Sequence, residues 1–167
     1  MKSVNCFLIV LMCCITITSC SQNNASNTNL ITDIFAGGTP CNSIVNTALK
    51  IPASDTCEYM KWELTIFGKD SSFKLLISYG AYQPNTMFFL NGGKSMRIAG
   101  KLKTTHCTRN NTKYKILHLV DDEKRPEVLF IELDNNILHL IDSNMKLIKG
   151  DPGMGFVLNR VNSSQTN

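Results

Sequence analysis

The chain has 167 residues, of which 43% are hydrophobic, and this suits one globular domain with a leader or a tail. Its 17 basic and 13 acidic residues give a formal net charge of +4, too small to predict a nucleic-acid-binding protein. We interpret the densest basic group as a solvated surface; it consists of Lys101, Lys103, Arg109, Lys113 and Lys115.

Residues 1–19 have the pattern of a signal peptide. Lys2 supplies a positive start, and the apolar run over residues 4–15 is shorter than the ~20 residues that span a membrane. The following residues, Ile17-Thr18-Ser19-Cys20, resemble the lipobox of bacterial lipoproteins. This resemblance implies that Cys20 is lipidated and anchors the mature chain in a membrane of the bacterial cell envelope. The alternative is ordinary secretion, with cleavage near Ser19.

Residues 20–32 are expected to form the lipidated end and a flexible tether, because residues 21–32 are polar, uncharged and low in complexity. We expect an outer-membrane location, with the domain facing the periplasm or the cell surface. The folded domain is predicted over residues 33–161, followed by a disordered tail over residues 162–167.

The domain is predicted to begin with a short strand over residues 33–38. Thr39 fits a helix N-cap and Pro40 fits the first helical position. Ile44, Val45, Ala48 and Leu49 lie at helical spacing on one side, so we predict a short helix over residues 40–49.

A long antiparallel hairpin is predicted over residues 57–80. Met60, Trp62, Leu64 and Ile66 alternate with polar residues, and residues 73–79 repeat this pattern after a turn at residues 68–71. The aromatic residues that we expect to point inward, either filling the interior or lining a cavity, are Trp62, Phe73 and Tyr79.

Further short strands are predicted over residues 86–90, 96–103, 114–120, 128–133, 137–141 and 156–161, separated by turns rich in Asn, Asp and Gly. Eight or nine strands with one early helix indicate a mainly β fold. We predict a small antiparallel up-and-down, lipocalin-like barrel of about eight strands, because closing the sheet removes its exposed edges. An antiparallel sandwich is the alternative.

Three segments resemble the NlpE-like family of envelope lipoproteins, which have lipocalin-like barrels. Residues 35–41 read Phe-Ala-Gly-Gly-Thr-Pro-Cys, similar to the family's opening, and residues 138–142 and 156–160 are similar to its closing strands. The resemblance implies a role in copper homeostasis or envelope stress. The second cysteine of the family's Cys-X-X-Cys motif is replaced here by Ile44, so the paired soft ligands that Cu(I) favours are missing.

Three cysteines follow Cys20 in the chain, and an oxidising compartment favours one disulfide and one free thiol. We predict a Cys41–Cys57 disulfide, because these two are nearest in sequence, and a free Cys107. The alternative is that all three are reduced and buried.

No residue pattern indicates an enzyme. His106 is expected in a loop, and His118 and His139 are expected in strands too far apart to assume that they share a metal. We therefore predict a non-enzymatic binding module without metal or cofactor. Its expected partners are the membrane, through the lipid, and either a small apolar ligand or an envelope protein. The alternatives are an NlpE-like copper-homeostasis or envelope-stress lipoprotein, and a hydrolase whose site is assembled only in space.

Overall fold

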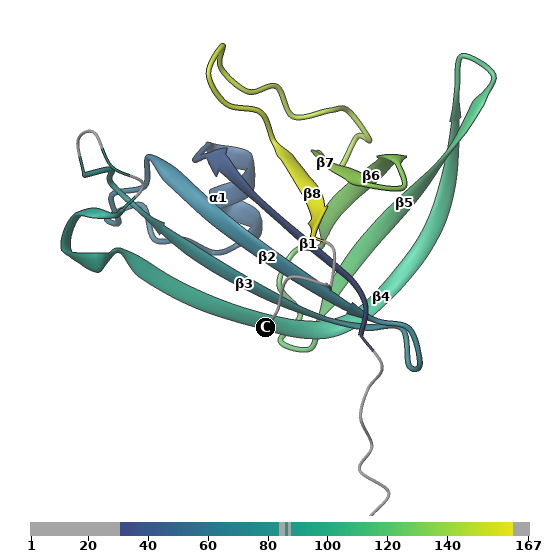
Figure 1. Cartoon of the computed structure of the whole chain (residues 1–167), viewed down its shortest axis with the longest axis horizontal. Coiled ribbons are helices and arrows are strands. Elements are labelled where there is room, and N and C mark those ends of the chain that lie inside the picture. Colours follow the sequence, from purple (N-terminus) through teal and green to yellow (C-terminus); the bar gives the residue numbers. More distant parts are fainter. Residues whose placement is uncertain (1–30, 84–85, 87, 162–167) are drawn as a thin grey trace, which may run out of the picture.

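The computed structural model describes residues 31–83, 86 and 88–161, so Cys20, the leader, most of the predicted tether and the predicted tail lie outside the described residues. Eight antiparallel strands follow one another around a closed barrel, as Figure 1 shows, and β8 pairs with β1 to close it. This confirms the predicted fold class. The strands are β1 (Ile31–Pro40), β2 (Tyr59–Phe67), β3 (Ser72–Gly80), β4 (Lys94–Arg109), β5 (Thr112–Asp121), β6 (Val128–Asp134), β7 (Ile137–Ile141) and β8 (Val157–Val161).

The predicted hairpin is β2 and β3, and its register puts Trp62 opposite Ile77. Because side chains alternate along a strand, one face of this hairpin carries most of its large apolar residues. These residues lie in the core of the barrel, and Met60, Leu64 and Ile77 are completely buried. Facing strands add further large side chains, including Phe130, Leu138 and Leu158. The interior of the barrel is therefore packed with side chains.

The predicted helix is α1 (Ser43–Ala48), which is shorter than expected and covers one end of the barrel (Figure 1). Its N-cap is Asn42, whose side-chain oxygen accepts a hydrogen bond from the Val45 N–H at 2.8 Å. The expected cap, Thr39, and Pro40 instead belong to β1. Because β1 pairs with β2 through Pro40↔Tyr59, the helix begins at Ser43, three residues later than predicted.

Four further expectations at the element level are corrected. β1 begins at Ile31, inside the predicted tether. The predicted strand over residues 86–90 is reduced to a single bridge between Tyr82 and Phe89, followed by the 3-10 turn η1 (Leu90–Gly92). β4 extends well past residue 103, because the polar residues after it still pair with β5. His106 consequently lies in a strand and not in a loop.

The long strand β4 curves around the barrel and continues with β5 into a protruding hairpin (Figure 1). Gly100 lies where β4 passes close to β5, since a Cβ atom there would come within 2.0 Å of the Val120 carbonyl oxygen. A small second apolar cluster lies on the outer side of β5–β7 and contains Ile116, Leu129, Ile131 and Ile141, with Cys107, Tyr114 and Met145 packed against it.

Candidate functional site

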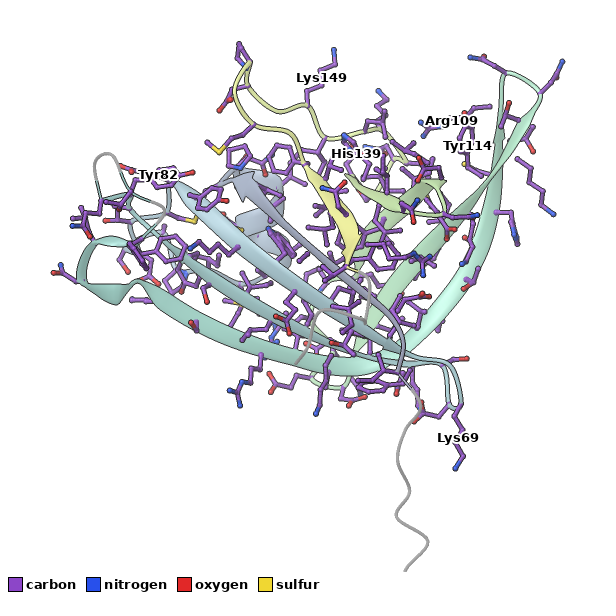
Figure 2. The ribbon with its side chains drawn as sticks, viewed as in Figure 1. Lys69, Tyr82, Arg109, Tyr114, His139 and Lys149 are labelled. Carbon is purple, nitrogen blue, oxygen red and sulfur yellow. A yellow bond between two sulfur atoms is a disulfide. The ribbon has the colours of Figure 1, made fainter. Side chains whose placement is uncertain are left out.

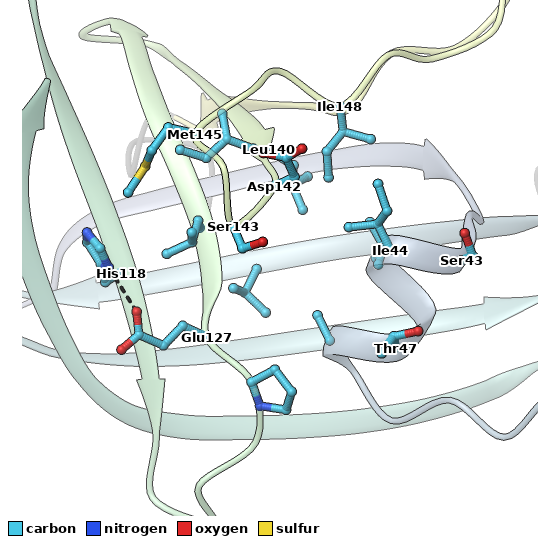
Figure 3. A pocket seen from close by; sticks show the side chains of 16 residues that line it. Ser43, Ile44, Thr47, His118, Glu127, Leu140, Asp142, Ser143, Met145 and Ile148 are labelled. Carbon is cyan, nitrogen blue, oxygen red and sulfur yellow. Dashed lines mark hydrogen bonds and ion pairs between the residues drawn. The ribbon is translucent and has the colours of Figure 1, made fainter. Parts of the chain in front are cut away.

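A cavity of about 620 Å³ opens between α1 and the neighbouring ends of β6 and β7 (Figure 3). Helix residues form one wall, and the segment after β7 forms the other. The lining residues are Ser43, Ile44, Val45, Thr47, Ala48, His118, Pro126, Glu127, Val128, Leu129, Leu140, Ile141, Asp142, Ser143, Met145 and Ile148. The size falls within the range of small-molecule sites, ~300–1,000 Å³.

The helical wall follows from the two faces of α1. Val45 and Leu49, four residues apart, are buried against the barrel interior. Ile44 and Ala48 are also four residues apart, each one residue before Val45 or Leu49, and they line the cavity. The sequence grouped these four residues on one side of the helix; in the structure Val45 and Leu49 belong to the buried core, and Ile44, Val45 and Ala48 line the cavity. Ile44 is 48% exposed, so part of its side chain is accessible from the cavity.

The wall after β7 is held by Asp142. Its side-chain oxygen accepts hydrogen bonds from the backbone N–H groups of Asn144 at 2.9 Å and Lys146 at 2.8 Å. Such local bonds stabilise a turn, and this turn carries Met145 to the cavity. Ile148 then returns to β7, where its N–H donates to the Leu140 carbonyl at 3.1 Å.

Three hydrogen-bonded side chains lie at one polar corner of the cavity. His118 Nδ1 lies 2.9 Å from Glu127 Oε2, as Figure 3 shows, and His118 Nε2 lies 2.8 Å from Thr105 Oγ1. Two fixed partners orient the imidazole ring. His118 and Glu127 line the cavity, whereas Thr105 does not. No sequence pattern predicts this hydrogen-bonded group, because β4, β5 and the segment before β6 supply one residue each.

The three aromatic residues considered for cavity lining point inward as expected, but they are packed into the core. Trp62 is only 2% exposed; its indole N–H donates to Thr39 Oγ1 at 2.9 Å, and its ring meets Phe130 edge-on with centroids 6.3 Å apart. None of the three lines the cavity beside α1. Phe73 and Tyr79 contribute instead to two separate surface depressions. Of the two roles expected for them, filling the interior or lining a cavity, the structure shows the first.

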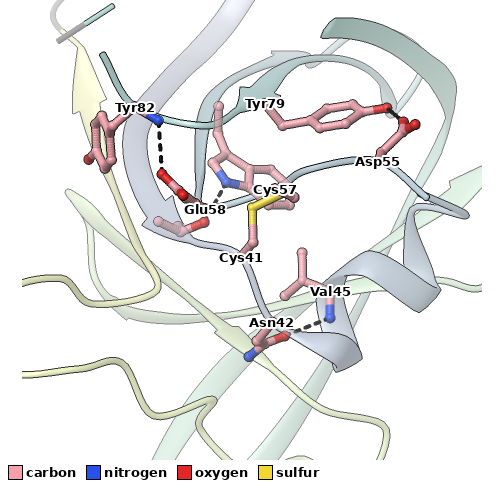
Figure 4. Close-up of a disulfide and its surroundings, with 10 residues drawn as sticks. Cys41, Asn42, Val45, Asp55, Cys57, Glu58, Tyr79 and Tyr82 are labelled. Atoms are coloured by element: carbon pink, nitrogen blue, oxygen red, sulfur yellow. Dashed lines mark hydrogen bonds between the residues drawn. A yellow bond between two sulfur atoms is a disulfide. The ribbon is translucent and has the colours of Figure 1, made fainter. Parts of the chain in front are cut away.

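The structure pairs Cys41 with Cys57 in a disulfide, the expected pairing, with Cα atoms 5.7 Å apart (Figure 4). This bond joins the segment before α1 to the start of β2. Cys107 is a free thiol, also as expected. While the disulfide is intact, Cys41 cannot act as a thiolate ligand for copper. Within the described ranges no group of three or more His, Cys, Asp or Glu side chains converges.

A second polar contact lies at the start of the β2–β3 hairpin. The Tyr79 hydroxyl donates to Asp55 Oδ2 at 2.9 Å, and the Lys94 ammonium group pairs with the other oxygen (Figure 4 shows the tyrosine contact). Hydrogen bonds from Lys94 and then from Tyr79 hold the pKa of Asp55 below its ordinary value. Desolvation and the neighbouring carboxylate raise the pKa of Tyr79 to about 12.

The other two histidines lie away from this cavity. His106 is exposed in β4, and His139 Nδ1 lies 2.7 Å from the Leu140 carbonyl oxygen in β7. Figure 2 shows His139 and the tip of the β4–β5 hairpin, marked by Arg109, on the same side of the molecule. Neither histidine is among the residues that line the cavity.

None of the helices in the described part of the chain has the length and apolar character needed to cross a membrane. No family model, no curated protein and no solved structure matches the chain. The fold and the site define the class of protein: a closed eight-stranded barrel with a mostly apolar cavity beside α1. The NlpE-like family stays a prediction based on the residues quoted above.

Proposed function

We propose that the protein is a bacterial envelope lipoprotein, anchored through Cys20, whose barrel domain is a non-enzymatic binding module. The leader and the lipobox-like residues before Cys20 support the anchor. The observation that carries the binding role is the cavity beside α1, because its walls contain apolar side chains that neighbouring elements leave accessible. The packed barrel interior favours this site beside α1 over one in the centre of the barrel.

The composition of the cavity wall defines the class of ligand. Ile44, Ala48 and Met145 offer apolar contact to the body of a small molecule. His118 and Glu127 offer hydrogen-bonding groups at one corner, with the ring already oriented. The ligand is therefore a small molecule with an apolar body and one polar end.

Titration with the fluorescent apolar probe N-phenyl-1-naphthylamine tests this role. Ile44→Asp places a charge in the cavity wall and leaves the buried face of α1 intact. It should weaken probe binding at least about tenfold, since losing the burial of part of an isoleucine costs on the order of 1.4 kcal/mol. Leu133→Asp is the matched control, because Leu133 is 42% exposed and lies outside the cavity. Equal weakening by both variants, or no saturable binding to the wild type, would rule out the cavity as the binding site.

A hydrolase is the second candidate, because Thr105, His118 and Glu127 have the order of a nucleophile, a base and an orienting carboxylate. In this reaction Thr105 Oγ1 attacks an ester carbonyl while His118 Nε2 takes its proton. The proton then passes to the leaving alcohol as the ester bond breaks, and water hydrolyses the acyl-threonine.

Esters of p-nitrophenol with short acyl chains test the hydrolase. Thr105→Val should abolish any turnover, whereas Thr104→Val should retain it, because Thr104 points to the other side of the same strand. Turnover that both variants retain would exclude Thr105 as the nucleophile. Absence of turnover by the wild type would exclude hydrolase activity towards these esters.

A further inference from the structure

The charges of the chain are strongly segregated along the sequence. Between Asp70 and Asp121 there is no Asp or Glu, and all 13 acidic residues lie outside this stretch. The same stretch contains eight basic residues and forms most of β3, β4 and β5. These are Lys74, Lys94, Arg97, Lys101, Lys103, Arg109, Lys113 and Lys115.

Four of these residues share the outer face of β3 and β4, which we call the basic face: Lys74, Arg97, Lys101 and Lys103. Phe73, Leu75 and Ile98 point into the core, so the alternating residues point outward. Lys74 pairs with Ala99, which places it diagonally between Arg97 and Lys101 on the neighbouring strand. All four residues are exposed.

The positive charge of the basic face is only partly compensated. Lys101 pairs with Asp70 at 3.8 Å, but its side chain is still 62% exposed, and such pairs contribute little. Glu63 on β2 and Asp122 after β5 border the face. Of the described residues, no carboxylate forms an ion pair with Lys74, Arg97 or Lys103. Like charges on neighbouring strands repel, so an anionic surface that covers them is favoured.

The basic face also lies where the chain leaves the barrel. Ile31, the first residue of β1, lines the same surface depression as Lys74 and Lys101. Ile31 is 51% exposed, which adds an apolar side chain to the edge of the face. Eleven residues run from Cys20 to Leu30, and even a fully extended chain of this length spans at most about 40 Å. An anchor at Cys20 therefore keeps this end of the barrel close to the bilayer.

We infer that the basic face docks on an anionic phospholipid bilayer and so fixes the orientation of the barrel on the membrane. The inference extends the proposed lipid anchor, but it concerns side chains of the folded barrel and is tested without the anchor. Figure 2 shows Lys69, next to the basic face in the β2–β3 turn, and Lys149, beyond β7, on opposite sides of the molecule. Basic residues far from the face are therefore available as controls.

The test is cosedimentation of the full chain carrying Cys20→Ser with vesicles of phosphatidylcholine, alone or mixed with phosphatidylglycerol. Each basic residue close to an anionic surface strengthens binding about fivefold. The triple variant Lys74→Glu, Arg97→Glu, Lys101→Glu should therefore lower binding to the anionic vesicles at least about 100-fold at low salt. The matched control is Lys50→Glu after α1 combined with Lys146→Glu and Lys149→Glu after β7. It makes the same change in net charge outside β3 and β4 and should lower binding less than about tenfold.

Added salt should also release the wild-type domain from the anionic vesicles, since the Debye length falls to about 10 Å at 0.1 M. Circular dichroism of both triple variants checks that each is folded. Equal losses for the two triple variants, or wild-type binding that is the same on neutral vesicles, would overturn the inference. Retention on immobilised polyglutamate without any vesicle binding would also overturn it and indicate an acidic protein partner. Because every sample carries Cys20→Ser, these outcomes do not depend on lipidation.

Discussion

Trp62 and Thr39 provide a sensitive test of the packed barrel interior. Trp62 on β2 donates its indole N–H to the hydroxyl of Thr39 on β1 at 2.9 Å, and Thr39 is completely buried. Truncation by Trp62→Ala removes a buried ring and also leaves that hydroxyl without its partner. We expect a loss of about 4 kcal/mol or more, against the ~5–15 kcal/mol typical of a domain. We therefore expect this variant to have a small free energy of unfolding.

Milder changes isolate the hydrogen bond. Trp62→Phe leaves the Thr39 hydroxyl unpaired, and Thr39→Val leaves the indole N–H unpaired, so each should cost about 1–3 kcal/mol. The double variant removes both polar partners and should cost less than the two single losses combined. The expected coupling is about 1–2 kcal/mol, which is typical of residues in direct contact.

Urea unfolding followed by far-ultraviolet circular dichroism measures these losses without relying on tryptophan emission. The four proteins should unfold with similar m-values, under conditions that keep the disulfide intact. Losses that add to within about 0.5 kcal/mol would show that the two side chains do not interact and would refute this description of the core. As a separate check, Trp62 emission in the wild type should be blue-shifted, as expected of a buried indole, and red-shifted emission would contradict its inward orientation.

Three further outcomes are expected. Removing the disulfide with Cys41→Ala and Cys57→Ala should lower the free energy of unfolding by about 3 kcal/mol, measured by urea unfolding, and an unchanged value would mean that the bond is absent or redundant. The pKa of Tyr79 is raised from 10 to about 12, so this residue contributes fully to the free energy of unfolding below pH 10, and its contribution is lost as the pH rises towards 12. Tyr79→Phe should remove that part of the loss of stability at alkaline pH. An unaltered dependence of stability on pH would argue against the contact with Asp55. Finally, Cys20→Ala should release the protein from membranes into the soluble fraction, and retention after a carbonate wash would contradict the lipid anchor.

Much of the barrel follows directly from the sequence. The alternation of Met60, Trp62 and Leu64 with polar residues predicts a strand with one buried side, and the structure buries all three. Asn110 and Asn111 take positive φ angles at the predicted turn between β4 and β5, which suits their tolerance of this conformation. Such features depend on residues close together in the chain, so local patterns are enough to predict them.

The candidate site depended on the tertiary structure. Helical spacing places Ile44 and Val45 on one side of α1, but only the position of the helix against the barrel decides that Val45 is buried and that Ile44 stays half-exposed beside the cavity. Thr105, His118 and Glu127 meet because the register of β4 with β5 and the path into β6 bring them together. No spacing in the sequence encodes such a contact. Local sequence determines which side of each element is apolar. The packing of these elements in the closed barrel determines where apolar surface is left uncovered.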